Sequence, residues 1–151
     1  MIELKSTYFT LDEFTSSQIA IRKNIDNTPT DLVIVNLNWL CSKILDPLRG
    51  KLNKPIVISS GYRCPKLNLE AGGSLIPPSQ HTMGKAADLI IPGMKPKEVM
   101  DYIIEQTKLP FDQLIYEYKS WVHISYDHDK VIQRGSKLQI EIDKDYEVYI
   151  K

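Results

Sequence analysis

Two histidines and one aspartate of this chain lie where they could do chemistry together. His81 and Asp88 belong to the segment Ser-Gln-His-Thr-Met-Gly-Lys-Ala-Ala-Asp, and His123 follows in Trp-Val-His-Ile-Ser. The chain has three histidines, so this pattern uses most of them. Either histidine alone would be interpreted as a structural residue. Together, two imidazoles and one carboxylate make three ligands, and three protein ligands plus a water hold a catalytic zinc. We therefore interpret His81, Asp88 and His123 as candidate ligands of one Zn²⁺ ion.

Alternation along two expected strands indicates where two of these side chains point. In the strand 86–91, Asp88 lies beside an apolar run, where an unpaired carboxylate is unfavourable. A metal ion is one partner for it, and a turn at the strand end is the alternative. In the strand 121–127, His123 and Trp121 share the face opposite the apolar residues. His123 therefore points to the polar side of the sheet.

Glu117 is the candidate catalytic base, and the length of a turn decides whether it can act. A three-residue turn at 118–120 sets Glu117 opposite Trp121 and on the face of His123, whereas a two-residue turn points it away. The alternative is a solvated strand glutamate. Arg63 ends the segment Ser-Gly-Tyr-Arg after an expected strand, and it suits a substrate carboxylate or an oxyanion. It could equally be a surface arginine paired with an acid.

Composition predicts a single soluble globular domain over residues 1–151, with 128–151 as a C-terminal hairpin extension. Nineteen basic and nineteen acidic residues cancel, which argues against nucleic acid as a partner. No apolar run has the length of a membrane span or a signal peptide, so we expect no membrane partner and synthesis in the cytoplasm. A substrate outside the cell would then be reached by release or lysis. We expect a monomer, and both Cys41 and Cys64 as free thiols.

The elements that must position these residues predict an α+β fold, with N-terminal helices packed on an antiparallel sheet. A capping box at Thr10 starts a helix that we expect to run to residue 22. The segment Thr28-Pro29-Thr30-Asp31 indicates a second helix start with proline in the first helical position, and apolar spacing predicts a long amphipathic helix from there. The remaining expectations are strands at 55–59, 86–91, 111–117 and 121–127, a long irregular loop at 66–78, a helix at 96–108, and a final hairpin of 137–143 with 146–150. His128 falls in a polar turn and is interpreted as a solvated residue.

The spacing resembles a known zinc-ligand pattern, Ser-x-His-x-x-Gly-x-Ala-x-Asp followed by Trp-x-His. It is similar to the pattern of D-Ala-D-Ala carboxypeptidases and L-Ala-D-Glu endopeptidases, peptidoglycan peptidases that share a fold with the Hedgehog signalling domain. The likeness extends over about residues 7–126 and points to a branch found in phages and bacterial genomes. The residues that carry the pattern are Ser79, His81, Gly84, Ala86, Asp88, Trp121 and His123.

The resemblance implies an activity and its site residues, and one residue of this chain departs from the family pattern. It implies His81, Asp88 and His123 as zinc ligands. Several relatives carry an acidic base three residues before the last histidine, where this chain has Ser120. Glu117 is the nearest upstream acid. The residues expected at the substrate are Arg63, Ser79, Gln80 and Trp121.

These observations leave two main hypotheses about function. The first is zinc-dependent hydrolysis of a peptide bond in the peptidoglycan stem peptide, with the loop after Leu67 as one wall of the cleft. The second is a non-catalytic, zinc-stabilised module that binds a cell wall or forms part of a virion. A position of Glu117 far from the metal would favour this second hypothesis. A metal-free structural protein would require the pattern to be coincidence.

Overall fold

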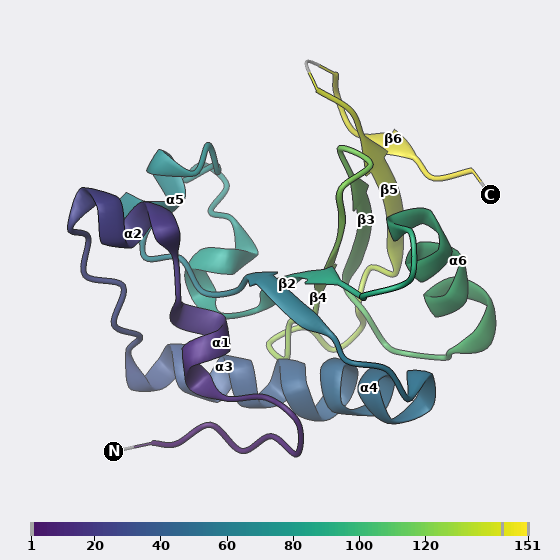
Figure 1. Ribbon diagram of the computed structural model, residues 1–151, viewed down its shortest axis with the longest axis horizontal. Helices are drawn as coiled ribbons and strands as arrows, with labels where there is room; N and C mark the ends of the chain where they lie inside the picture. The colour runs from purple at the N-terminus through teal and green to yellow at the C-terminus, as the bar shows by residue number, and fades with distance from the viewer. Residues whose placement is uncertain (1, 143, 151) are drawn as a thin grey trace.

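A six-stranded sheet crosses the middle of the molecule in the computed structural model, which describes residues 2–142 and 144–150 (Figure 1). Its order is β1-β2-β4-β3-β5-β6. The strands are β1 (Val57–Ser60), β2 (Ala86–Ile90), β3 (Gln113–Glu117), β4 (Trp121–Ser125), β5 (Ser136–Ile140) and β6 (Glu147–Val148). All neighbours pair antiparallel except β3 and β5, which are parallel. The expected final hairpin is present as β5 and β6, while residue 143 of its predicted first strand lies outside the described residues, as do the domain ends 1 and 151.

The parallel pair corrects the expectation of a purely antiparallel sheet. Asp112 directly precedes β3, and its carboxylate Oδ1 accepts a hydrogen bond from the backbone N–H of Arg134 at 2.9 Å. The carbonyl of Asp112 also accepts from the N–H of Ser136 at 3.0 Å. These bonds fix the start of β5 beside the start of β3, so the two strands run in the same direction. Local spacing carries no sign of this contact, which joins residues 22 positions apart.

A long helical rod lies along one side of the sheet and begins at Asp31, two residues after the start predicted at Pro29. It consists of α3 (Asp31–Leu40), a π-helical segment η1 (Cys41–Leu45) and α4 (Asp46–Leu52). Thr30 caps it by accepting from the N–H of Val33. The N–H of Asp46 donates to the carbonyl of Cys41, one residue further back than in an α-helix. Pro47 follows at once and has no N–H to donate, which favours this wider turn.

Two local expectations are wrong. The helix predicted over 11–22 is two helices, α1 (Leu11–Thr15) and α2 (Gln18–Lys23). The break falls at Ser16 and Ser17, because the Ser17 side chain caps α2 by accepting from the N–H of Ala20. The loop predicted over 66–78 contains a helix, α5 (Pro65–Glu70), which has proline in its first turn.

One apolar core joins the helical rod to one face of the sheet. Buried side chains from α3 and η1 share a cluster with α6 (Pro96–Gln106) and with β2, β3 and β4, and they include Leu37, Ile44, Met100, Leu89, Leu114 and Ile124. Asp88 and His123 lie on the other face, because alternation turns them away from Leu89 and Ile124. The core therefore holds the sheet rigid beneath the polar residues. None of the helices among the described residues is long and apolar enough to cross a membrane.

Candidate metal centre and its cleft

His81, Asp88 and His123 meet on the polar face of the sheet, and all three are buried. Asp88 on β2 is paired directly with His123 on β4. His81 comes from a short 3₁₀ helix, η2 (Gln80–Met83), which immediately precedes β2. Gly84 ends that helix at a φ of +70°, and a Cβ there would lie 2.7 Å from the carbonyl oxygen of Val33. Glycine thus lets this loop turn back against α3.

The three ligand atoms form a nearly equilateral triangle. The Nε2 of His81 lies 3.1 Å from the Nδ1 of His123 and 3.3 Å from the Oδ1 of Asp88. The same Oδ1 lies 3.1 Å from the Nδ1 of His123. Tetrahedral zinc with bonds of about 2.0–2.1 Å requires ligand atoms about 3.3 Å apart. His81, Asp88 and His123 could therefore bind a zinc ion and leave its fourth position open.

A backbone contact determines which His81 nitrogen faces the triangle. The Nδ1 of His81 lies 2.7 Å from the carbonyl oxygen of Gly61, so this nitrogen carries the proton and donates it. The Nε2 then keeps its lone pair for a metal, which is the usual arrangement of a ligating histidine. Gly61 itself fits closely, because a Cβ there would lie 2.6 Å from the carbonyl oxygen of Phe14.

Electrostatics favour the ionised form of Asp88. Burial opposes ionisation, but the neighbouring imidazoles of His81 and His123 outweigh it and hold the pKa of Asp88 below its usual value. A carboxylate that stays ionised while buried is suited to a cation. The donor set of two imidazoles and one carboxylate is also typical of zinc.

Glu117 lies beside the triangle, and the predicted three-residue turn is confirmed. Glu117 on β3 pairs directly with Trp121 on β4. Its Oε1 lies 3.9 Å from the Nδ1 of His123, and its Oε2 accepts a hydrogen bond from the Trp121 indole at 3.0 Å. Burial raises the pKa of Glu117, although the charge of His123 opposes the shift. A carboxylate with a raised pKa is suited to exchanging protons near neutral pH.

Arg63 lines a cavity of about 510 Å³ next to Asp88. The cavity is bounded by the turn between α1 and α2, the end of β1, the start of α5, and Trp121. The Nε of Arg63 is buried and meets no hydrogen-bond partner among the described residues. Burial lowers the pKa of Arg63, whereas the charges of Asp88 and Glu117 raise it. Because Arg63 lines the cavity, its guanidinium is a candidate to bind an anionic group of a ligand.

Ser79 and Gln80 make contacts within the protein, and neither lines this cavity. The hydroxyl of Ser79 accepts from the N–H of His81, so it caps η2. The side-chain amide of Gln80 donates to Asp112 at 2.9 Å. Of the four residues expected at the substrate, Arg63 and Trp121 border the cavity. The other two support the loop that carries His81.

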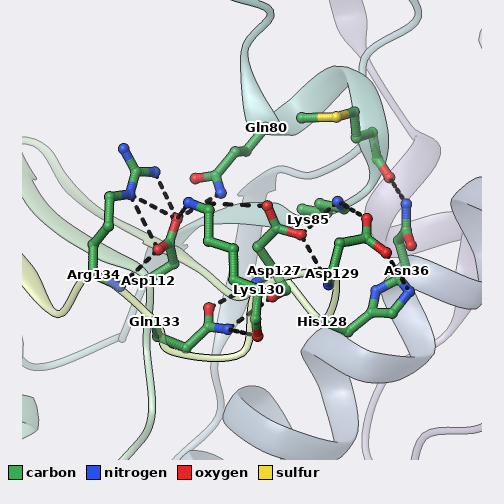
Figure 2. A network of polar contacts seen from close by, with 11 residues as sticks. Asn36, Gln80, Lys85, Asp112, Asp127, His128, Asp129, Lys130, Gln133 and Arg134 are labelled. Atoms are coloured by element: carbon green, nitrogen blue, oxygen red, sulfur yellow. Dashed lines mark hydrogen bonds and ion pairs between the residues drawn. The ribbon is translucent and has the colours of Figure 1, made fainter.

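The sequence analysis did not predict a network of charged residues around Asp112 and Lys85 (Figure 2). Asp112 is fully buried and accepts hydrogen bonds from Gln80, from Lys130 at 2.9 Å and from the Nη2 of Arg134 at 2.6 Å. Lys85, which is also buried, bridges two further carboxylates. The signal for Asp112 was the one used for Asp88, a carboxylate beside an apolar strand that needs a partner. No spacing pointed to Arg134.

His128 differs from its expected role as a solvated residue. Its ring stacks on Trp39 of α3, with centroids 5.6 Å apart and planes 11° from parallel. Its side chain is 23% exposed, so it is partly buried between the C-terminal loop and the helical rod. The two cysteines, Cys41 and Cys64, are free thiols as expected.

Comparison with known proteins places most of the chain in one family. A family model described as Peptidase M15 matches residues 7–125. The match includes the three candidate ligands, Arg63 and Glu117, and it ends at the last residue of β4. No curated protein matches the chain.

Proposed function

Because the chain belongs to the peptidase M15 family, we propose that it is a zinc peptidase that hydrolyses a peptide bond in the peptidoglycan stem peptide. In this proposal His81, Asp88 and His123 hold one zinc ion, and Glu117 is the general base. The bond belongs to the carboxypeptidase or the endopeptidase type. The observation that carries the proposal is the position of Glu117, whose Oε1 lies 3.9 Å from the Nδ1 of His123.

The proposed mechanism assigns separate tasks to the residues around the triangle. Zinc bound there would polarise the scissile carbonyl and lower the pKa of a water to about 7. Glu117 takes a proton from the attacking water and returns it to the leaving amine. The Trp121 indole holds one carboxylate oxygen of Glu117, so the other is free for this transfer. Arg63, which lines the cavity, offers its guanidinium to a substrate carboxylate or to the developing oxyanion.

The cavity beside Asp88 supports a peptide as the substrate. Its lining comes from separate segments of the chain, which include β1, the α1–α2 turn and α5. The helix α5 stands where an irregular loop was expected, so this wall has a defined shape that can discriminate between side chains. Ser59 and Ser60 on the cavity wall add small polar groups at the end of β1.

The non-catalytic module is the rival hypothesis. This hypothesis arises because Ser120 occupies the position where several relatives carry their base. It requires that no other acidic side chain lies near the metal. The short distance between Glu117 and His123 supports the peptidase instead. Glu117 directly precedes the β3–β4 turn, and Ser120 lies within it. The hairpin can therefore bring the Glu117 carboxylate to the site in place of an acid at position 120.

The experiment that tests this function uses purified peptidoglycan as substrate. The zinc-loaded protein should release peptide fragments or free amino acids, and their masses identify the bond that is cut. Treatment with a chelator should abolish release, and added zinc should restore it. A zinc-loaded protein that releases nothing from peptidoglycan, while a Glu117→Gln variant behaves identically, would favour the non-catalytic module.

A further inference from the structure

Four residues on neighbouring strands form a row across the site face of the sheet. Trp121 on β4 pairs with Glu117 on β3, and Glu117 pairs with Ile140 on β5. Leu138 pairs with Val148 between β5 and β6, and extending that register sets Tyr146 opposite Ile140. Directly paired residues share a face of a sheet. The side chain of Tyr146 therefore rises on the same face as Glu117, two strands or about 10 Å away.

The β5–β6 hairpin is fastened to the turn that carries Glu117. The N–H of Tyr118 donates to the carbonyl of Ile140 at 2.8 Å. The Nζ of Lys119 forms an ion pair with Glu141 at 3.3 Å. Figure 1 shows the β5–β6 hairpin and the β3–β4 turn at the same end of the sheet. The position of Tyr146 relative to Glu117 is thus held by contacts on both sides of the turn.

The charges of the site act on the Tyr146 phenol. Burial raises the pKa of Tyr146, and the charges of Glu117 and Asp88 raise it further. The charge of Arg63 has the opposite effect. The phenol is therefore within electrostatic range of Glu117, Asp88 and the Arg63 guanidinium. It also keeps its proton at neutral pH, so it can donate a hydrogen bond.

Tyr146 is placed to meet a ligand rather than to fill the core. The residue is 57% exposed, and Tyr118 on the adjoining turn is 37% exposed. The ring of Tyr118 lies edge-on to that of Trp121, with centroids 5.4 Å apart. Trp121 lines the cavity of Arg63, and Tyr118 extends this aromatic border toward β5. Tyr146 follows residue 125, where the family match ends, so this residue belongs to the C-terminal extension.

We propose that the C-terminal extension completes the substrate cleft, with the Tyr146 hydroxyl donating a hydrogen bond to a carbonyl or carboxylate oxygen of the bound peptide. The inference rests on the proposed peptidoglycan peptidase and adds a substrate-binding residue to it. The peptide then lies between Arg63 on one side and Tyr146 on the other, across Glu117. A substrate with an oxygen at both positions is selected over a shorter one.

The test measures equilibrium binding in a protein that does not cut its ligand. The parent is the zinc-loaded Glu117→Gln variant, and the probe is the mixture of soluble muropeptides that a glycan-cleaving enzyme releases from peptidoglycan. Adding Tyr146→Phe removes one hydroxyl and keeps the ring. Its matched control is Tyr8→Phe, because Tyr8 is 47% exposed and its ring packs against Arg49 of α4, outside the cavity beside Asp88. Calorimetry gives Kd for each protein.

Tyr146→Phe should weaken muropeptide binding about 10-fold, the usual effect of losing one hydrogen bond to a polar or charged group. Tyr8→Phe should leave Kd within about twofold of the parent. An equal Kd for the parent and Tyr146→Phe would overturn the role of Tyr146 while the proposed peptidase stands. A parent that binds zinc but no muropeptide would overturn the peptidoglycan substrate, and the role of Tyr146 with it, before any comparison of variants.

Discussion

Asp88 and His123 lie directly opposite each other on β2 and β4, with the Oδ1 of Asp88 3.1 Å from the Nδ1 of His123. Two candidate ligand side chains on a paired position of the sheet need little rearrangement to meet an ion. His81 adds a third candidate donor from a loop that is fixed by Gly61 and Gly84. The three side chains could therefore bind a metal ion without a large rearrangement.

Replacing one ligand should remove the metal. We expect His123→Ala to lower zinc affinity at least about 100-fold, because changing even an outer partner of a metal site costs 10–100-fold. The measurement is the zinc content of the purified protein, with competition against a chelator for affinity. His128→Ala is the matched control, since His128 stacks on Trp39 and faces no part of the triangle. Unchanged zinc content in His123→Ala would contradict the ligand assignment.

Replacing the proposed base should separate catalysis from metal binding. Glu117→Gln keeps the shape of the side chain and one hydrogen-bond acceptor, so zinc content should not change. Its kcat on peptidoglycan fragments should fall about 10²–10⁴-fold, the usual contribution of general acid–base catalysis. Glu3→Gln changes an exposed glutamate outside the sheet and should leave kcat unaltered. If Glu117→Gln keeps full kcat, another group serves as the base.

The alternation of side chains along each strand made part of the site predictable from the sequence. The faces of Asp88 and His123 and the pairing of Glu117 with Trp121 follow from the period of two within each strand and from one turn length. Such features depend on neighbours in sequence. The family resemblance, confirmed over residues 7–125, supplied the connection to His81.

The features that escaped prediction depend on contacts between distant residues. The parallel pairing of β3 and β5 depends on Asp112 binding the loop that contains Arg134. The choice of Nε2 in His81 depends on the carbonyl of Gly61, which is 20 residues away. The break between α1 and α2 is local. There the Ser17 side chain caps a new helix, although the apolar pattern favours one continuous helix.

The buried Asp112 should make the stability of the protein dependent on pH. Burial opposes its ionisation, but bonds from Arg134 and Lys130 hold its pKa below the ordinary value of about 3.9. A carboxyl group with a lowered folded-state pKa stabilises the fold above the unfolded pKa, and that contribution is lost as pH falls toward the folded pKa. We therefore expect the stabilising contribution of Asp112 to decline below about pH 4.

Asp112→Asn tests this contribution. At pH 7 the free energy of unfolding should fall by about 2–3 kcal/mol, because charge-assisted hydrogen bonds are lost from a buried position. The difference from the unmodified protein should shrink below about pH 4, where Asp112 itself begins to take up a proton in the unfolded state. Urea unfolding at several pH values measures it. Asp145→Asn, at an exposed site, should change stability by less than about 0.5 kcal/mol, and a pH-independent difference for Asp112→Asn would contradict the expected linkage.

The two thiols should differ in reactivity because only one of them is accessible. Burial raises the pKa of the Cys41 thiol to about 12, and its side chain lies in the core of η1 with no exposed surface. Cys64 is partly exposed at the start of α5. Since the thiolate is the reactive form, a disulfide reagent at pH 8 should modify one thiol in the folded protein and both in urea. Cys64→Ser should abolish the reaction of the folded protein, and a fast reaction that survives this change would mean that the core around Cys41 opens readily.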